Sequence, residues 1–123
     1  MQRTILIVDD SPTVLMSLKM NLEMHGFKVE TADNGKTALD KLKGGAVRAD
    51  LIITDLNMPQ LDGFGLIKEV RSLPEYRFKP ILVLTTESQV KKRQEAKRLG
   101  ATGWIVKPVS GNDLINVVKK VLP

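Results

Sequence analysis

Short apolar runs alternate with amphipathic stretches along the whole chain. Four of these runs are nearly uninterrupted, which is the pattern expected of strands buried on both faces of a sheet. They cover residues 5–8, 51–54, 81–84 and 103–106. Residues 27–32 instead alternate apolar and polar side chains, which predicts a less buried strand. The chain is therefore expected to form five strands.

The stretches between the predicted strands carry helix start and stop signals. Ser11, Asp62 and Ser110 are favoured N-cap residues, and Pro12 suits the first position of a helix. Apolar residues then recur at intervals of three or four, and most stretches end at or before a glycine or proline. One predicted helix covers about residues 88–99, and the others begin after Ser11, after Asn34-Gly35, after Asp62 and after Ser110.

A strand followed by a helix thus occurs five times in succession. This alternation predicts a mostly parallel sheet with helices on both faces, because crossovers between parallel strands are long and right-handed. We expect an α/β fold of the flavodoxin-like kind, (βα)5, with strands in the order 2-1-3-4-5. No linker, repeat or low-complexity segment interrupts the pattern, so residues 1–123 are expected to form one domain.

The first predicted helix carries two stripes of apolar residues at helical spacing. These stripes are Val14–Leu18–Leu22 and Met16–Met20–Met24. Methionine is flexible and commonly fills gaps in a core. We therefore interpret the methionine stripe as core rather than as a partner-binding surface.

Composition narrows the class of protein without choosing a function. The chain has no cysteine and one histidine, which excludes disulfides, thiolate metal sites and multi-histidine clusters. No apolar run approaches the roughly 20 residues that a membrane-spanning helix needs, and no signal peptide is evident. These features predict a cytoplasmic protein without a membrane role. The net charge of +5 suits nucleic acid or an acidic protein, but aromatic residues make up only 4%, so base stacking is not expected.

Charged and hydroxyl side chains follow the predicted strands at their carboxyl ends. Asp9 and Asp10 follow the first strand, Asp55 the third, Thr85 the fourth and Lys107 the fifth. Because these ends share one edge of a parallel sheet, we expect the five side chains to meet in one cleft. Adjacent carboxylates repel each other unless a cation intervenes, and without soft ligands a hard cation such as Mg²⁺ fits best.

This set of groups is typical of a phosphoryl-transfer site. Mg²⁺ binds one or two carboxylates plus phosphate oxygens, and a carboxylate such as Asp55 can be the nucleophile that forms an acyl phosphate. Lys107 and Thr85 would stabilise charge on the transferring oxygens. Each residue alone has an ordinary structural explanation, but their occurrence at successive strand ends favours the functional interpretation.

Four segments together resemble the receiver domains of bacterial two-component response regulators. They read ILIVDDS, DLIITDLNMPQLDG, ILVLTTES and GATGWIVKP. The resemblance covers essentially the whole chain. With no output domain attached, the chain is most similar to the single-domain chemotaxis regulators of this family.

The resemblance implies roles around the acceptor. Asp55 matches the phosphoacceptor, which receives a phosphoryl group from a histidine kinase. Mg²⁺ would be bound by Asp10, by Asp55 and by the backbone carbonyl of Asn57, with Asp9 acting through a metal-bound water. Such a protein catalyses its own phosphorylation and slow dephosphorylation, and is not an enzyme in the metabolic sense.

The resemblance also implies a switch and an output surface. Lys107 matches the lysine that contacts a phosphoryl oxygen, commonly before a cis proline. Thr85 matches the hydroxyl that moves onto the phosphoryl group, and Trp104 matches an aromatic switch position that is usually Tyr or Phe. The helix near 88–99 carries five basic residues against one acid, so Lys91, Lys92 and Trp104 are expected to face an acidic downstream protein, such as a flagellar motor switch component.

The residues leave several alternatives open. The chain could act as a phosphorelay intermediate or phosphate sink outside chemotaxis. A phosphatase of the haloacid dehalogenase type also uses an aspartate nucleophile, but it carries a second acid two residues later, where this chain has Asn57. Gly63-Phe64-Gly65 is too short for a dinucleotide fingerprint, and no phosphate-binding GxxxxGK[ST] motif is present.

Overall fold

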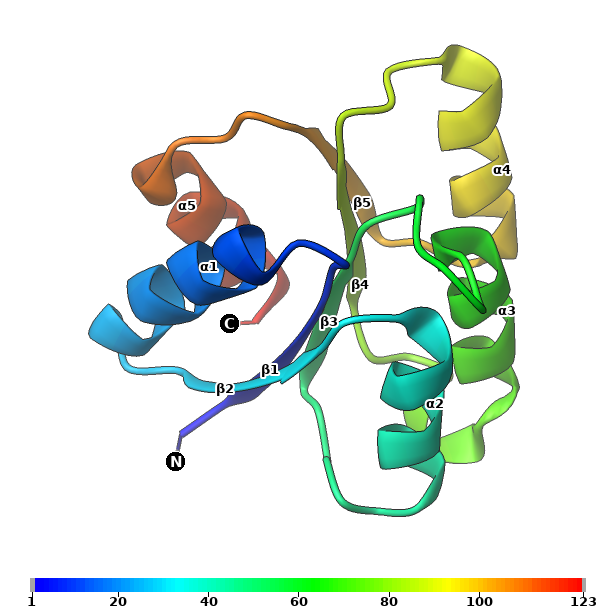
Figure 1. The fold of residues 1–123 in the computed structure, drawn as a ribbon, viewed down its shortest axis with the longest axis horizontal. Coiled ribbons are helices and arrows are strands. Elements are labelled where there is room, and N and C mark those ends of the chain that lie inside the picture. Colours follow the sequence, from blue (N-terminus) through cyan, green and yellow to red (C-terminus); the bar gives the residue numbers. More distant parts are fainter. Residues whose placement is uncertain (1, 123) are drawn as a thin grey trace.

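Five parallel strands form the sheet at the centre of the computed structural model, which describes residues 2–122 (Figure 1). They are β1 (Thr4–Val8), β2 (Lys28–Ala32), β3 (Leu51–Thr54), β4 (Ile81–Thr85) and β5 (Gly103–Val106). Their order is β2-β1-β3-β4-β5, and every pairing is parallel. The predicted flavodoxin-like topology is confirmed, and it places β1 beside β3.

Helices cover both faces of the sheet (Figure 1). One face carries α1 (Pro12–Met24) and α5 (Gly111–Val121), and the other carries α2 (Gly35–Lys43), α3 (Gly63–Ser72) and α4 (Val90–Leu99). A short 3-10 turn, η1 (Pro74–Tyr76), follows α3. Among the described helices, none combines the length and apolar character that crossing a bilayer requires.

Side-chain caps start most of the helices where the sequence predicts them. The side chains of Ser11, Asp62 and Ser110 each accept a hydrogen bond from the backbone N–H three residues later, at 2.8–3.3 Å. Asn34 caps α2 in the same way. These bonds satisfy backbone donors that a helix leaves free in its first turn.

Alternate strand residues pack into two separate cores. Leu6 and Ile52 join the cluster beneath α2, α3 and α4, while Ile5 and Ile53 join the cluster beneath α1 and α5. Because β1, β3 and β4 are almost completely buried on both faces, the carboxyl ends of these strands are firmly positioned.

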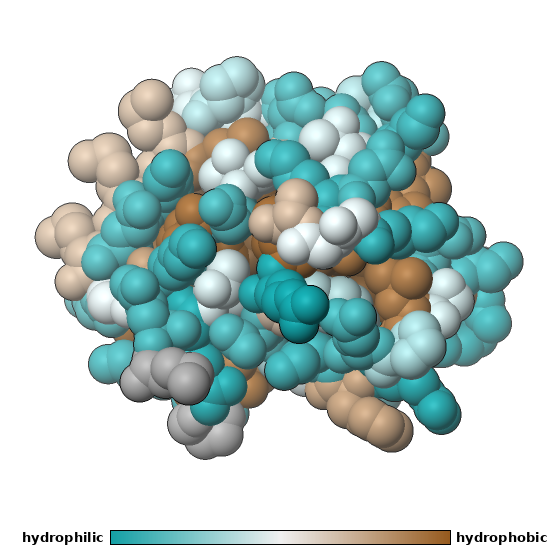
Figure 2. All heavy atoms as spheres, turned by 90° about the horizontal axis from the view of Figure 1, so that it is seen from below, coloured by the Kyte–Doolittle hydropathy of each residue, from teal (hydrophilic) through white to brown (hydrophobic). Residues whose placement is uncertain are grey.

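The prediction that the methionine stripe belongs to the core is wrong. Met16, Met20 and Met24 are 66%, 60% and 81% exposed, on the side of α1 that faces away from the sheet. In Figure 2, tan apolar side chains gather at the left edge, the side on which α1 lies. Leu18 and Leu22 already occupy the face that packs on the sheet, and a helix with one packed side has room for only one such stripe.

Helix α4 has few apolar contacts with the core. It begins at Val90 rather than near residue 88, so Val90 lies in the first turn and is 67% exposed. Ala96 is the only buried residue of the helix, and Leu99 is partly buried against the core. The apolar contacts of α4 with the core are therefore made by its C-terminal half.

Candidate functional site

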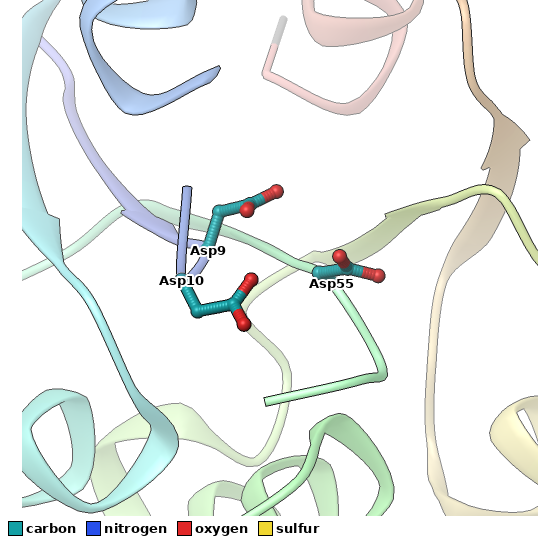
Figure 3. A group of neighbouring side chains, drawn as sticks. All are labelled: Asp9, Asp10 and Asp55. Atoms are coloured by element: carbon teal, nitrogen blue, oxygen red, sulfur yellow. The ribbon is translucent and has the colours of Figure 1, made fainter. Parts of the chain in front are cut away.

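Asp9, Asp10 and Asp55 lie together at the carboxyl edge of the sheet. Figure 3 shows their three side chains around one space, two from the end of β1 and one from the end of β3. One carboxylate oxygen of each lies within 4.8 Å of those of the other two. The strand register explains this, since Val8 pairs with Thr54 and the acids follow directly. The predicted gathering of the three acids is therefore observed.

Lys107 comes from the end of β5 and reaches two of these acids. Its Nζ donates to Asp9 Oδ2 at 2.7 Å and to Asp55 Oδ2 at 3.3 Å. Burial of the ammonium alone would lower the pKa of Lys107, but the hydrogen bonds and charges of Asp9 and Asp55 outweigh burial and raise this pKa. Lys107 therefore stays protonated. The Lys107–Pro108 peptide bond is cis, as expected.

Backbone amides hold the remaining oxygens of two of the acids. Asp9 Oδ1 accepts from the N–H of Ser11 at 3.0 Å, and Asp55 Oδ1 accepts from the N–H of Leu56 at 2.7 Å. Asp9 is buried and Asp55 is partly buried, whereas Asp10 is exposed. The site thus combines two fixed carboxylates with one that is open to solvent.

The chemistry of this donor set fits Mg²⁺. All three side chains offer hard oxygen ligands, and one ammonium offsets only part of their negative charge. Asn57 lies in the exposed loop that follows β3, three residues after the end of the strand. The backbone carbonyl of Asn57 therefore belongs to the loop that directly follows Asp55.

Thr85 and Trp104 lie on the neighbouring strands β4 and β5. Thr85 is fully buried at the end of β4, and its Oγ1 accepts from the N–H of Glu87 at 3.3 Å. The Lys107 N–H donates to the Thr85 carbonyl oxygen at 2.8 Å. Trp104 pairs with Val83 on β4 and packs partly buried against the core beneath α4.

The residues expected on the output surface differ in their availability. Lys91 is exposed, but Lys92 donates to the Glu87 carboxylate at 3.1 Å. A hollow of about 200 Å³ lies between α4 and β5, and its lining includes Arg93, Lys97 and Trp104. Arg93 and Lys97, four residues apart on one face of α4, therefore line the same hollow as Trp104.

Two contacts of the site were not predicted from the sequence, although the sequence carries a signal for both. Ser11 follows Asp9 by two residues, and Glu87 follows Thr85 by two. An Asp or Thr side chain that accepts from the amide two residues later is a common local turn. This spacing indicates how Asp9 and Thr85 are held before any long-range contact forms.

Comparisons with known proteins agree with this architecture. The family model described as response regulator receiver domain matches residues 5–119. Chemotaxis protein CheY-3 of Vibrio cholerae is 38% identical over 118 residues, which are 95% of this chain and 89% of that protein. Protein PilH of Pseudomonas aeruginosa is 34% identical over 118 residues, covering 96% of each.

A solved structure shows the same fold over nearly the full length. Chemotaxis protein CheY4 of Vibrio cholerae is similar with a TM-score of 0.93 and 42% sequence identity, covering 98% of this chain and 99% of that chain. Receiver domains are signalling proteins and not metabolic enzymes. With this fold, this site and this extent of similarity, the chain belongs to the response regulator receiver domain family.

Proposed function

We propose that the chain, as one receiver domain spanning residues 1–123, accepts a phosphoryl group on Asp55 from a phosphohistidine of a histidine kinase. The observation that carries this proposal is the position of Asp55 Oδ2, 3.3 Å from the Lys107 ammonium and beside two further carboxylates. The lack of cysteine is consistent with the cytoplasmic setting expected from the sequence.

Asp55 would act as the nucleophile. One of its carboxylate oxygens attacks the phosphorus atom, a new O–P bond forms, and the P–N bond to the donor imidazole breaks. The bonding electron pair stays on the imidazole nitrogen, which takes a proton from solvent. Lys107 neutralises charge on the phosphoryl oxygens, and Asp9 holds the Lys107 ammonium in place at 2.7 Å.

Mg²⁺ is the cofactor that this donor set suits. Asp10, Asp55 and the backbone carbonyl of Asn57 would hold the ion directly, with Asp9 acting through a water. When bound, the ion supplies positive charge that offsets carboxylate repulsion and the charge of the phosphoryl oxygens. Lys107 alone leaves an excess of negative charge among the three acids, which supports a divalent cation here.

Phosphorylation would be read out on the surface formed by α4 and β5. Thr85 would turn its hydroxyl toward the phosphoryl group, and the packing of Trp104 would change. The exposed, basic surface that includes Lys91 suits an acidic downstream protein. Because relatives such as CheY-3 are named as chemotaxis proteins, a flagellar motor switch component is the leading candidate. A role as a phosphorelay intermediate or phosphate sink is the alternative.

The acceptor is tested by intact-mass measurement after incubation with acetyl phosphate and Mg²⁺. We expect the wild type to gain the mass of one phosphoryl group and Asp55→Asn to gain none, because an amide is a poor nucleophile. Asp62→Asn is the matched control, since asparagine caps a helix as well as aspartate does and Asp62 caps α3. A phosphoryl adduct on Asp55→Asn would show that the acceptor is elsewhere.

The output surface is tested by the affinity of a candidate acidic partner with and without beryllofluoride, a mimic of the acyl phosphate. We expect Lys91→Glu to weaken binding at low salt and Lys91→Glu/Lys92→Glu to weaken it further. Lys68→Glu on the exposed side of α3 is the control of equal charge. Equal affinity of the wild type and the double variant would exclude this surface.

A further inference from the structure

The C-terminal end of α4 is held by an arginine from α3. The guanidinium of Arg71 donates from Nε and Nη2 to the carbonyl oxygen of Gly100, at 3.0 and 2.7 Å. Its Nη1 also donates to the carbonyl oxygens of Tyr76 and Lys79, both at 2.6 Å. One side chain thus ties the end of α4 to η1 and to the loop before β4.

The turn from α4 into β5 is further fixed by its own residues. Gly100 ends α4 in a left-handed conformation with φ of 116°, and a Cβ atom there would lie 2.9 Å from Arg71 Cγ. Thr102 donates its N–H to the Ile81 carbonyl oxygen at 2.7 Å and accepts from the Ile81 N–H at 3.0 Å. This end of α4 is therefore joined to both α3 and β4.

The N-terminal end of α4 has much less to hold it. Its N-cap, Gln89, makes no side-chain cap hydrogen bond, and Val90 is exposed. Within residues 2–122, the Lys92–Glu87 ion pair is the sole side-chain polar link between α4 and another segment. Glu87 in turn donates its backbone N–H to Thr85 Oγ1. The polar side-chain contact of the N-terminal half of α4 thus leads, through Glu87, to the hydroxyl at the end of β4.

The first turn of α4 is not confined by packing, since Val90 at its start is exposed. The hollow of about 200 Å³ between α4 and β5 adjoins the C-terminal half of the helix, and Arg93 is the one residue of the N-terminal half that shares its lining with Trp104. Helix α4 has 10 residues and is about 15 Å long. A tilt of about 10° around its C-terminal end would move its first turn by roughly 2–3 Å.

We propose that Arg71 is a positioning residue that makes Gly100 the pivot of α4, so that the helix responds to the acceptor site by tilting at its N-terminal end. The movement would begin when Thr85 Oγ1 turns away from the Glu87 N–H, and the packing around Trp104 would change as a result. The response, though not the fixed pivot itself, rests on the proposed phosphorylation of Asp55.

The wild-type protein tests the pivot through backbone amide chemical shifts and amide exchange. On addition of beryllofluoride and Mg²⁺, we expect shifts at Glu87 and at residues 90–94 and little change at residues 98–102. Changes at residues 98–102 as large as those at 90–94 would overturn the pivot. Binding of beryllofluoride is measured separately by fluorine NMR, so a failure of the acceptor proposal is recognised as such.

Variants of Arg71 test its role directly. We expect Arg71→Met to raise the exchange rates of the Gly100 and Ala101 amides about tenfold and to reduce the Trp104 fluorescence change, while beryllofluoride still binds. Arg71→Lys should restore part of the fluorescence change, because an ammonium can still donate to the Gly100 carbonyl. Arg77→Met is the matched control, since Arg77 is exposed and its guanidinium lies 5.5 Å from the Phe78 ring.

Two outcomes distinguish positioning from general stability. A Trp104 response in Arg71→Met equal to that of the wild type would overturn the proposal. If Arg71→Met does not fold, Arg71→Lys and the wild-type shift map still decide the question. These measurements do not require an identified partner or kinase.

Discussion

The acidic edge of the sheet is connected to helix α4 through Lys107, Thr85 and Glu87. The two regions are nevertheless held in different ways. At the acidic edge, Asp9 and Asp55 are each bound by a backbone amide and by Lys107. At α4, the polar side-chain link of the N-terminal half is the ion pair of Lys92 with Glu87. Chemistry at a carboxylate needs fixed geometry, whereas a readout needs an element that a small free energy can move.

The largest effect is expected where the acidic edge is most tightly packed. A Cβ atom at Gly63 would lie 2.3 Å from the Asp55 carbonyl oxygen, so Gly63→Ala must displace the segment that carries Asp55. We expect a loss of about 2–4 kcal/mol in the free energy of unfolding, measured with urea. Gly111→Ala, whose nearest neighbour is the Asn21 side chain at 3.2 Å, should cost much less. Equal losses would show that the segment carrying Asp55 is packed no more tightly than the start of α5.

Lys107→Met should produce the next largest effect. It leaves the buried Asp9 carboxylate without its ammonium partner, at an ion pair that is 18% and 4% exposed. We expect a loss of about 1–3 kcal/mol in the free energy of unfolding in the presence of EDTA. Millimolar Mg²⁺ should recover part of this loss, because a divalent cation also offsets the carboxylate charge. Lys119→Met on α5 is the control for removal of a surface charge.

Mg²⁺ binding to the wild type should stabilise the fold by a smaller amount. At about ten times its dissociation constant, a ligand specific for the folded state adds about 1.4 kcal/mol. We expect the melting temperature to rise with Mg²⁺ and not with NaCl of equal ionic strength. Asp9→Asn and Asp10→Asn should each reduce this rise, because each removes one of the clustered charges. A melting temperature independent of Mg²⁺ would contradict the assignment of a metal site.

Glu87→Gln should have the smallest effect on global stability. Hydrogen bonding to Lys92 and to the Gln89 amide lowers the pKa of Glu87 below its ordinary 4.5. The contribution of this carboxylate is therefore present above its ordinary pKa and is lost as pH falls through the lowered value. In the wild type, and not in Glu87→Gln, the protection factor of the Arg93 amide, which donates to the Gln89 carbonyl oxygen, should decrease as the pH falls through this range. An identical pH dependence would show that the pair does not hold α4.

The position of the acidic edge can be predicted from the sequence because it depends on two simple features. Apolar runs of four residues fix where β1 and β3 end, and parallel pairing then brings Asp9 and Asp55 together. The helix caps were equally predictable, since Ser11 and Asp62 act through amides only three residues away. Local patterns and strand topology therefore carry most of the information about the fold and about the position of the acids.

The features of α4 depend on contacts between distant segments, which no local pattern encodes. Arg71 and Gly100 are 29 residues apart, and nothing in the sequence around Arg71 indicates three backbone carbonyls as its partners. Val90 is apolar, but the helix starts there and its side chain is exposed. The prediction for the methionines of α1 is wrong for a related reason, because spacing alone does not tell how many sides of a helix are covered.

Those methionines give the molecule an uneven susceptibility to oxidation. With no cysteine in the chain, methionine thioethers hold all of its sulfur. Peroxide would reach Met16, Met20 and Met24 readily, and the polar sulfoxides would remain in water at little cost to folding. Met58 differs, because it is half-buried with its Sδ 4.0 Å from Thr54 Oγ1, directly behind the strand end that carries Asp55. Peroxide would oxidise the exposed methionines of α1 first. Oxidation of Met58 would instead disturb the segment that carries Asp55.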